Sequence, residues 1–211
     1  MKQIIKTNNG DYSFEEQKFS NGIKTIDKKI AEKLLVSFKD VMDRNNIKFI
    51  LAYGTLLGAV REGDFIDHDE DIDVIILDED RYRFLDLLFE FRKSGLEVGR
   101  YEPDLLSLVK DGEYIDVYMF KKGRFGLRTM GKVVVKEEFL IDTIKYDFKG
   151  LAFDIPKNYI KYLVYHYGKD WKIPKKGDHA HNYNLVTKLK IRIKRLNPIF
   201  YDMIKRKLKK T

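Results

Sequence analysis

Two aspartates placed two residues apart, Asp71 and Asp73, are the residues of this chain best suited to chemistry. They lie in the segment DEDIDV, and the apolar run at 74–77 after them is typical of a β-strand that enters a core. Because side chains alternate faces along a strand, both carboxylates point the same way. Neighbouring anions repel each other, and a divalent cation is the usual remedy. Hard oxygen ligands favour Mg²⁺ or Mn²⁺, so we expect a metal site for a phosphate-bearing substrate.

A Gly-Thr pair, Gly54 and Thr55, precedes these carboxylates. Glycine lets the backbone come close to a phosphate, and the N–H groups at the start of a following helix face an anion. Taken alone, the pair is equally typical of a plain turn. A strand ending in Gly-Thr, a short helix and a strand bearing Asp-x-Asp together resemble the nucleotidyltransferase superfold. We therefore expect an α+β fold, with a mixed β-sheet flanked by helices.

Hydrophobic periodicity predicts the elements that position these residues. A polar stretch at 1–22 is either a lead-in or a short ordered arm. The predicted helices span residues 25–45, 56–61, 80–93 and 159–167. The predicted strands span residues 47–53, 71–77, 105–109, 114–120, 126–129 and 132–135.

Composition limits the classes of protein that remain. The chain has 211 residues, enough to bury a core in one domain, and its 44% hydrophobic and 35% charged residues are ordinary for a globular protein. The absence of cysteine excludes disulfides, thiolate nucleophiles and cysteine-ligated zinc. The N-terminal residues lack the apolar core of a secretory signal, and no apolar run is long enough for a spanning helix. We expect a cytoplasmic location.

Positive charge is concentrated at the C-terminus. Residues 175–211 carry nine Lys and three Arg against two Asp, a net charge of +10, which leaves −2 for the rest of a chain whose total is +8. A near-neutral body argues against a nucleic-acid partner. Two basic amphipathic helices are predicted, at 185–196 and 199–208. They either contact an anionic membrane surface peripherally, or pack on the domain and end in a solvated tail.

Three segments of the chain resemble the LicD family, which includes the fukutin-like enzymes. Residues 54–61 read GTLLGAVR, residues 63–74 read GDFIDHDEDIDV, and residues 167–174 read YGKDWKIP. The resemblance extends over about residues 30–175. Asp67 and His68 replace the family's usual Pro-Trp, and Glu70 replaces an Asp, but the Asp-x-Asp pair is retained.

This resemblance implies transfer of a phosphate-linked group, such as phosphocholine, from a CDP-linked donor to a saccharide or lipid-linked glycan acceptor. Asp71 and Asp73 would hold Mg²⁺ (or Mn²⁺) across the diphosphate. A third carboxylate is expected from a neighbouring strand, and Asp116 is the best candidate. It would bind a second metal or act as general base toward a sugar hydroxyl. The alternative is a carboxylate on a solvated sheet face.

Two further residues are candidates for substrate binding. Arg61 has the planar fork to reach a donor phosphate, or it is an exposed arginine that ends a helix. Trp171 could form the wall of a sugar or base pocket, although aromatic stripes usually belong to a core. The acidic pair Asp69 and Glu70 is expected to support the metal ligands or to face solvent. His166 is expected to pack in an aromatic helix.

These expectations divide the chain into an N-terminal arm (1–24), a catalytic domain (25–184) and a basic helical tail (185–211). A nucleotidyltransferase that moves a nucleoside monophosphate from an NTP shares the expected fold, so fold does not separate the two activities. A catalytically dead binding module is the third possibility. The retained Asp71, Asp73 and Asp116 argue against it.

Overall fold

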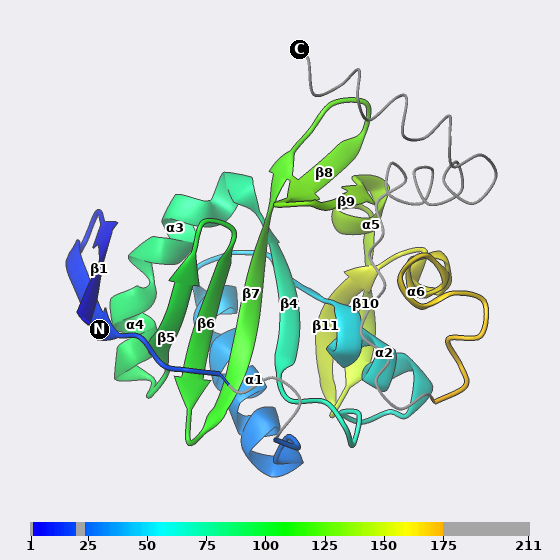
Figure 1. Cartoon of the computed structure of the whole chain (residues 1–211), viewed down its shortest axis with the longest axis horizontal. Coiled ribbons are helices and arrows are strands. Elements are labelled where there is room, and N and C mark those ends of the chain that lie inside the picture. The colour runs from blue at the N-terminus through cyan, green and yellow to red at the C-terminus, as the bar shows by residue number, and fades with distance from the viewer. Residues whose placement is uncertain (1, 20–23, 175–211) are drawn as a thin grey trace, which may run out of the picture.

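A mixed β-sheet forms the centre of the computed structural model, which describes residues 2–19 and 24–174 (Figure 1). Its main path has the order β10-β11-β3-β4-β7-β6-β5. These strands are β3 (Ile50–Leu51), β4 (Ile72–Leu77), β5 (Glu97–Glu102), β6 (Leu105–Lys110), β7 (Glu113–Lys122), β10 (Thr143–Phe148) and β11 (Leu151–Pro156). β4 pairs in parallel with β7, and β11 with β3, whereas the other neighbours on this path are antiparallel. β8 (Leu127–Met130) and β9 (Val133–Lys136) form a hairpin that extends β7.

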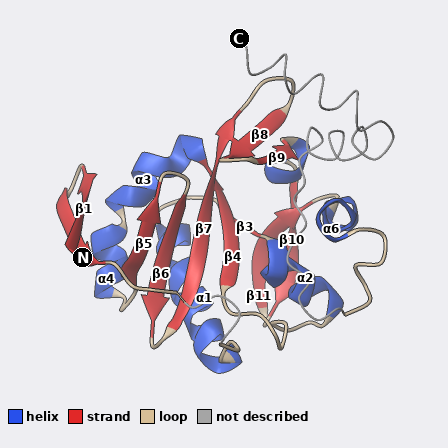
Figure 2. Cartoon of the chain, in the orientation of Figure 1, coloured by secondary structure: helices blue, strands red, loops and turns tan. Residues whose placement is uncertain are grey.

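Helices pack on both sides of this sheet (Figure 2). They are α1 (Lys28–Arg44), α2 (Tyr53–Arg61), α3 (Arg81–Asp86), α4 (Leu88–Lys93), α5 (Glu138–Ile141) and α6 (Tyr159–Tyr167). α1 contacts β7, and α4 contacts β5. α2 and α6 contact each other and lie near β4 and β11. The mixed sheet with flanking helices confirms the predicted α+β class.

The two central strands, β4 and β7, have one apolar face. The opposite face carries the acidic side chains and is called the chemical face. One face carries Ile72, Val74 and Ile76 of β4 and Ile115, Val117 and Met119 of β7, all buried in the core. α1 contributes Leu34, Phe38 and Val41 to the same core. Because side chains alternate along a strand, Asp73 and Asp116 point to the opposite face.

The N-terminal residues form a hairpin of β1 (Lys2–Thr7) and β2 (Gly10–Glu15). Its turn is fixed to α3, since the backbone N–H and the side-chain amide of Asn8 both donate to the Asp86 carboxylate, at 2.7 and 2.8 Å. The hairpin therefore belongs to the folded body. No helix of the described ranges, 2–19 and 24–174, is long and apolar enough to cross a membrane.

Several predicted elements differ from the structure. The predicted helix at 80–93 is a 3₁₀ turn (Asp78–Asp80) followed by α3 and α4, which meet at Leu87. The predicted strand at 47–53 pairs only at Ile50–Leu51, because the chain turns into α2 at Tyr53. β5, β10 and α5 had no predicted counterpart. β10 is an edge strand with exposed polar residues, which gives it no continuous apolar signal. The predicted helices at 185–196 and 199–208 lie outside the described residues.

Candidate metal and phosphate site

Asp73 lies where the N-terminus of α2 docks on β4. The Gly54 N–H donates to Asp73 Oδ2 at 2.9 Å, and the Asp73 N–H donates to Thr55 Oγ1 at 2.8 Å. Tyr53 has a positive φ of 39°, a left-handed conformation that is costly for a non-glycine residue. It turns the chain sharply between β3 and α2. The predicted Gly-Thr pair thus fixes the position of Asp73, and its role toward a substrate phosphate stays a prediction.

Asp69 approaches this turn from the loop that precedes β4. A Cβ built on Gly54 would lie only 2.0 Å from Asp69 Oδ2, so a glycine is required for the carboxylate to sit there. The Ile26 N–H donates to the Asp69 carbonyl at 2.9 Å and holds this part of the loop. From the sequence, Asp69 was expected to support the metal ligands or to face solvent. Its approach to Gly54 depends on tertiary structure, which leaves no signal in local spacing.

Three carboxylates, Asp69, Asp71 and Asp73, converge on one point. Each offers one oxygen, and the three oxygens lie within 4.8 Å of one another. Ligands on opposite sides of a Mg²⁺ ion stand about 4.2 Å apart, so this spacing suits one ion. Burial raises the pKa of Asp73 well above its ordinary value, and the neighbouring carboxylates, Asp71 first, raise it further. A cation would relieve that repulsion, and the residues present fit a divalent metal.

Asp116 joins the site from the neighbouring strand. It stands directly opposite Asp73 in the parallel β4–β7 pair, and the two residues are 3% and 6% exposed. Burial raises the pKa of Asp116, and the Arg100 guanidinium opposes that shift. Arg100 Nη2 donates to both carboxylate oxygens, at 3.0 and 2.7 Å, and the Ser107 hydroxyl donates to one of them. The structure thus brings the predicted third carboxylate beside Asp73, but paired with an arginine.

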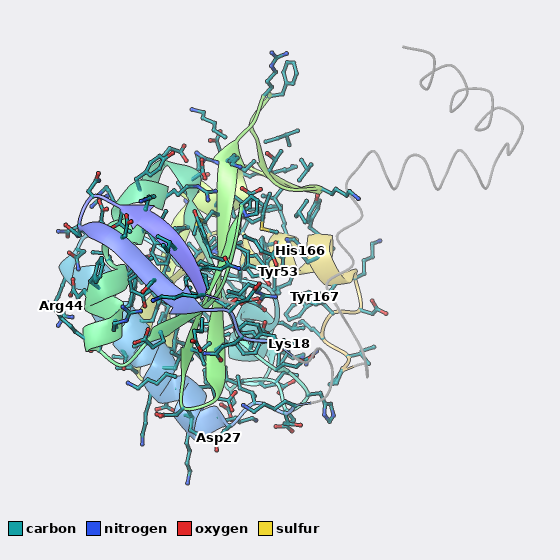
Figure 3. The ribbon with its side chains drawn as sticks, turned by 60° about the vertical axis from the view of Figure 1, so that its left-hand side comes forward. Lys18, Asp27, Arg44, Tyr53, His166 and Tyr167 are labelled. Carbon is teal, nitrogen blue, oxygen red and sulfur yellow. The ribbon has the colours of Figure 1, made fainter. Side chains whose placement is uncertain are left out.

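Aromatic side chains gather where α2 meets α6, and Figure 3 labels three of them, Tyr53, His166 and Tyr167. The Tyr53 ring lies 5.2 Å from the rings of Tyr118 and His166, centre to centre. Burial raises the pKa of the Tyr167 hydroxyl, and the charges of Asp73 and then Asp69 raise it further. His166 is buried among tyrosines, in agreement with its predicted packing role.

Arg61 and Trp171 form one packing unit beside the site. Arg61 pairs with the Glu62 carboxylate, and its Nη1 donates to the Trp171 carbonyl at 3.3 Å. Trp171 is only 6% exposed, which favours the core interpretation of its ring. His68 is exposed on the acidic loop, whereas His179 and His181 lie outside the described residues.

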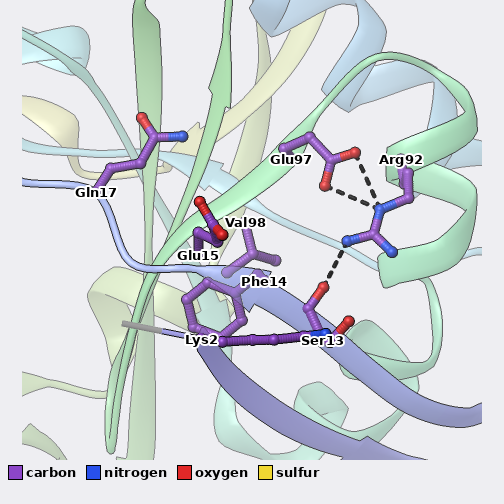
Figure 4. Close-up of a pocket in the computed structure, with 8 residues that line it drawn as sticks. All are labelled: Lys2, Ser13, Phe14, Glu15, Gln17, Arg92, Glu97 and Val98. Atoms are coloured by element: carbon purple, nitrogen blue, oxygen red, sulfur yellow. Dashed lines mark hydrogen bonds and ion pairs between the residues drawn. The ribbon is translucent and has the colours of Figure 1, made fainter.

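A cavity of about 320 Å³ opens elsewhere, between the N-terminal hairpin and β5 (Figure 4). Three of its polar residues already satisfy one another. Arg92 Nε donates to both oxygens of Glu97, and Arg92 Nη2 donates to the Ser13 carbonyl. The carboxylate cluster is therefore the better candidate for chemistry.

Comparison with known proteins identifies related sequences. Residues 46–158, more than half of the chain, match the model of the LicD/FKTN/FKRP nucleotidyltransferase domain. Ribitol-5-phosphate transferase FKTN of Homo sapiens is 29% identical over 161 residues, which cover 71% of this chain and 34% of that protein. An uncharacterized protein of Rickettsia typhi, RT0683, is 33% identical over 89 residues, which cover 42% of this chain and 28% of that protein. The chain spans about a third of the length of these relatives.

Among solved structures, the antibiotic-resistance factor ANT(2'')-Ia has a TM-score of 0.50 at 12% identity. The match covers 87% of this chain and 93% of that one. At this identity the likeness concerns the fold alone. It agrees with the nucleotidyltransferase-like fold predicted from the sequence.

Proposed function

The chain belongs to the LicD/FKTN/FKRP family, and from this premise we propose that it is a metal-dependent transferase of a phosphate-linked group. The donor is a CDP-activated alcohol, and the acceptor is a hydroxyl of a cell-surface glycan of capsule, lipopolysaccharide or teichoic acid type. The observation that carries the proposal is the convergence of Asp69, Asp71 and Asp73 beside the N-terminus of α2. A partly buried cluster of anions next to the positive end of a helix is suited to a cation and a phosphate together.

Each part of the site has a task in this reaction. Asp69, Asp71 and Asp73 would hold Mg²⁺ or Mn²⁺, which neutralises charge on the diphosphate when bound. The N-terminus of α2, on the β3 side of Asp73, would add the positive end of its helix dipole to the charge that attracts a phosphate. Asp116, on the opposite side, would take the proton of an incoming hydroxyl or bind a second metal. Gly54 keeps the backbone close to the carboxylates.

A second candidate is transfer of a nucleoside monophosphate from an NTP, which the shared nucleotidyltransferase domain supports. The products separate the two activities. We expect CMP from CDP-ribitol, CDP-glycerol or CDP-choline with Mg²⁺, and no pyrophosphate from CTP. CDP-ribitol is the first donor to test, because the human relative is a ribitol-5-phosphate transferase. Pyrophosphate release from CTP without CMP release from these donors would favour the second candidate.

Variants of the carboxylates test the assignment of roles. Asp73→Asn is expected to abolish turnover, and Asp69→Asn to weaken Mn²⁺ binding measured by calorimetry. Asp116→Asn is expected to lower turnover while Mn²⁺ binding persists, because Asp116 lies outside the converging set. Asp147→Asn, an exposed aspartate on β10, is the matched control. Unchanged metal binding in Asp69→Asn and Asp73→Asn would disprove the metal site.

A further inference from the structure

The N-terminal segment places an aromatic ring against the chemical face of the sheet. After β2 the chain runs across β5 and β6 toward β7 (Figure 1). The Gln17 N–H donates to the Gly99 carbonyl at 2.8 Å and fixes this segment to β5. The Phe19 ring then packs on Tyr114 of β7, with 4.5 Å between the ring centres. Tyr114 shares a strand face with Asp116, so Phe19 lies close to the site.

Gly99 makes room for this ring. The β5–β6 register shifts between Val98 and Arg100, and Gly99 sits in that irregularity. A Cβ at Gly99 would lie 2.8 Å from Phe19 Cζ and 2.6 Å from Val109 Cγ2. The packing of the Phe19 ring at this position therefore depends on Gly99, as expected for a specific docking contact.

Arg100 connects Phe19 to the carboxylates. Its guanidinium carbon lies 4.9 Å from the centre of the Phe19 ring, a cation–π distance. Arg100 Nε donates to Ser107 Oγ at 3.0 Å, while Nη2 donates to both oxygens of Asp116. Arg100 stands opposite Ser107 on β6, and Ser107 stands opposite Asp116 on β7, so the hydrogen bonds from Arg100 to Asp116 reach across β6. The row across the sheet is Arg100, Ser107, Asp116 and Asp73.

We propose that Arg100, seated against Phe19, positions Asp116 for the transfer step, so that the N-terminal segment is part of the active site. The inference rests on the proposed function. The charge of Asp116 interacts with two neighbouring carboxylates, Asp71 and Asp73, and their repulsion would push its side chain away from a fixed orientation. A single nitrogen of Arg100, Nη2, donates to both oxygens of Asp116 and holds the carboxylate on the β6 side, apart from the converging set. Asp116 then remains available to the incoming hydroxyl.

Two simpler roles make different predictions. If Arg100 only stabilised the fold, its loss would lower thermal stability, turnover and metal binding together. If it were only a countercharge for the carboxylates, saturating Mg²⁺ would restore turnover. Positioning predicts a third pattern. Arg100→Gln lowers kcat for CMP release about 10–100-fold, leaves the KM for the donor unchanged, and is not rescued by Mg²⁺.

The metal-binding readout does not depend on the reaction. In Arg100→Gln, Asp116 is no longer held by the guanidinium and can turn toward Mn²⁺ bound by the converging carboxylates, so the ion is expected to bind more tightly. In an Asp116→Asn background the same substitution should change Mn²⁺ affinity little, because Arg100 acts through Asp116. An equal gain in both backgrounds would overturn the positioning role. This outcome is distinct from the failure of the proposed function, in which the wild type would release no CMP.

Phe19→Ala is the milder variant, should Arg100→Gln fail to fold. We expect it to shift kcat and Mn²⁺ affinity in the same directions as Arg100→Gln, by a smaller factor. The double variant of Phe19→Ala and Arg100→Gln should have the same kcat and Mn²⁺ affinity as Arg100→Gln alone. Phe125→Ala is the matched control, since Phe125 is 94% exposed at the turn between β7 and β8. Equal effects of Phe19→Ala and Phe125→Ala, or full additivity of Phe19→Ala with Arg100→Gln, would refute the link from the N-terminal segment to Asp116.

Discussion

Gly54 has two functions at the scale of the single residue. Its N–H donates to the Asp73 carboxylate, and its missing side chain leaves space for the Asp69 carboxylate. Both functions serve the convergence of the acidic residues rather than the flexibility of the turn. The glycine is therefore a structural part of the proposed metal site, although it offers no ligand of its own.

Gly54→Ala is expected to displace Asp69 and weaken Mn²⁺ binding, because the new Cβ would overlap its Oδ2. The overpacking should lower the free energy of unfolding by about 1–3 kcal/mol. Calorimetric titration with Mn²⁺ and chemical denaturation measure the two effects. In an Asp69→Ala background most of the stability cost should disappear, since the clashing carboxylate is gone. A cost that persists there would mean that the substitution acts on the backbone instead.

Only part of the carboxylate site could be predicted from sequence. Asp71 and Asp73 could be predicted, because no tertiary information is needed to know that two residues spaced two apart on a strand share a face. Asp116 could be predicted, because a lone carboxylate in an apolar strand implies a partner or a ligand. Asp69 and Arg100 were missed, because one depends on a loop folding over Gly54 and the other on the register of β5, β6 and β7.

At the scale of elements, the β8–β9 hairpin is tied to the sheet by one buried arginine. Arg128 of β8 forms ion pairs with Glu79, in the 3₁₀ turn after β4, and with Glu137, after β9. Its Nη1 also donates to the Phe120 carbonyl of β7. The hydrogen bond from Arg128 lowers the pKa of Glu79, against the opposing effect of burial. Three elements thus share one cation, and their mutual placement depends on the charge of Glu79.

Glu79→Gln should lower the free energy of unfolding at pH 7 by up to about 1 kcal/mol, since Glu79 is partly solvent-exposed. A lowered pKa means that the stabilisation is present above the ordinary carboxyl pKa of about 4.3 and is lost as the pH falls through the folded value. The difference from wild type should therefore close below about pH 4 in urea titrations. The control is Glu138→Gln, because Glu138 is an exposed glutamate next in sequence to Glu137. A difference that stays constant down to pH 3 would contradict this ionic role.

Elements were predictable where one face of a segment is apolar over several residues. Helix α6 and strand β4 agree closely with the predicted 159–167 and 71–77. The predicted helix at 80–93 is broken at Leu87, because α3 and α4 each direct their own apolar residues into the core. β5 carries Gly99 and several charged residues, and its strand conformation comes from pairing with β6, which local sequence does not reveal.

At the scale of the whole molecule, charge and structure are distributed differently along the chain. In the described body, positive and negative side chains are interspersed and form ion pairs, whereas the positive excess belongs to residues 175–211. That tail lies outside the described residues, so its amphipathic helices and its membrane contact stay predictions. Its charge pattern is compatible with two outcomes. A solvated end would be dispensable, whereas a membrane-binding end would bring the carboxylate site to a lipid-linked acceptor.

Truncation after Asn184 removes seven Lys and three Arg but leaves the carboxylate site intact. Each cation near an anionic surface contributes about 1 kcal/mol, so the full chain is expected to sediment with phosphatidylglycerol-containing vesicles and the truncated chain is not. High salt should release the full chain, because the attraction is screened. Vesicles of phosphatidylcholine alone are the control for apolar insertion. CMP release from a soluble donor should be equal for the two chains. Equal sedimentation of the two chains would place any membrane contact on the body instead, where the exposed Phe125 at the β7–β8 turn is the first residue to replace.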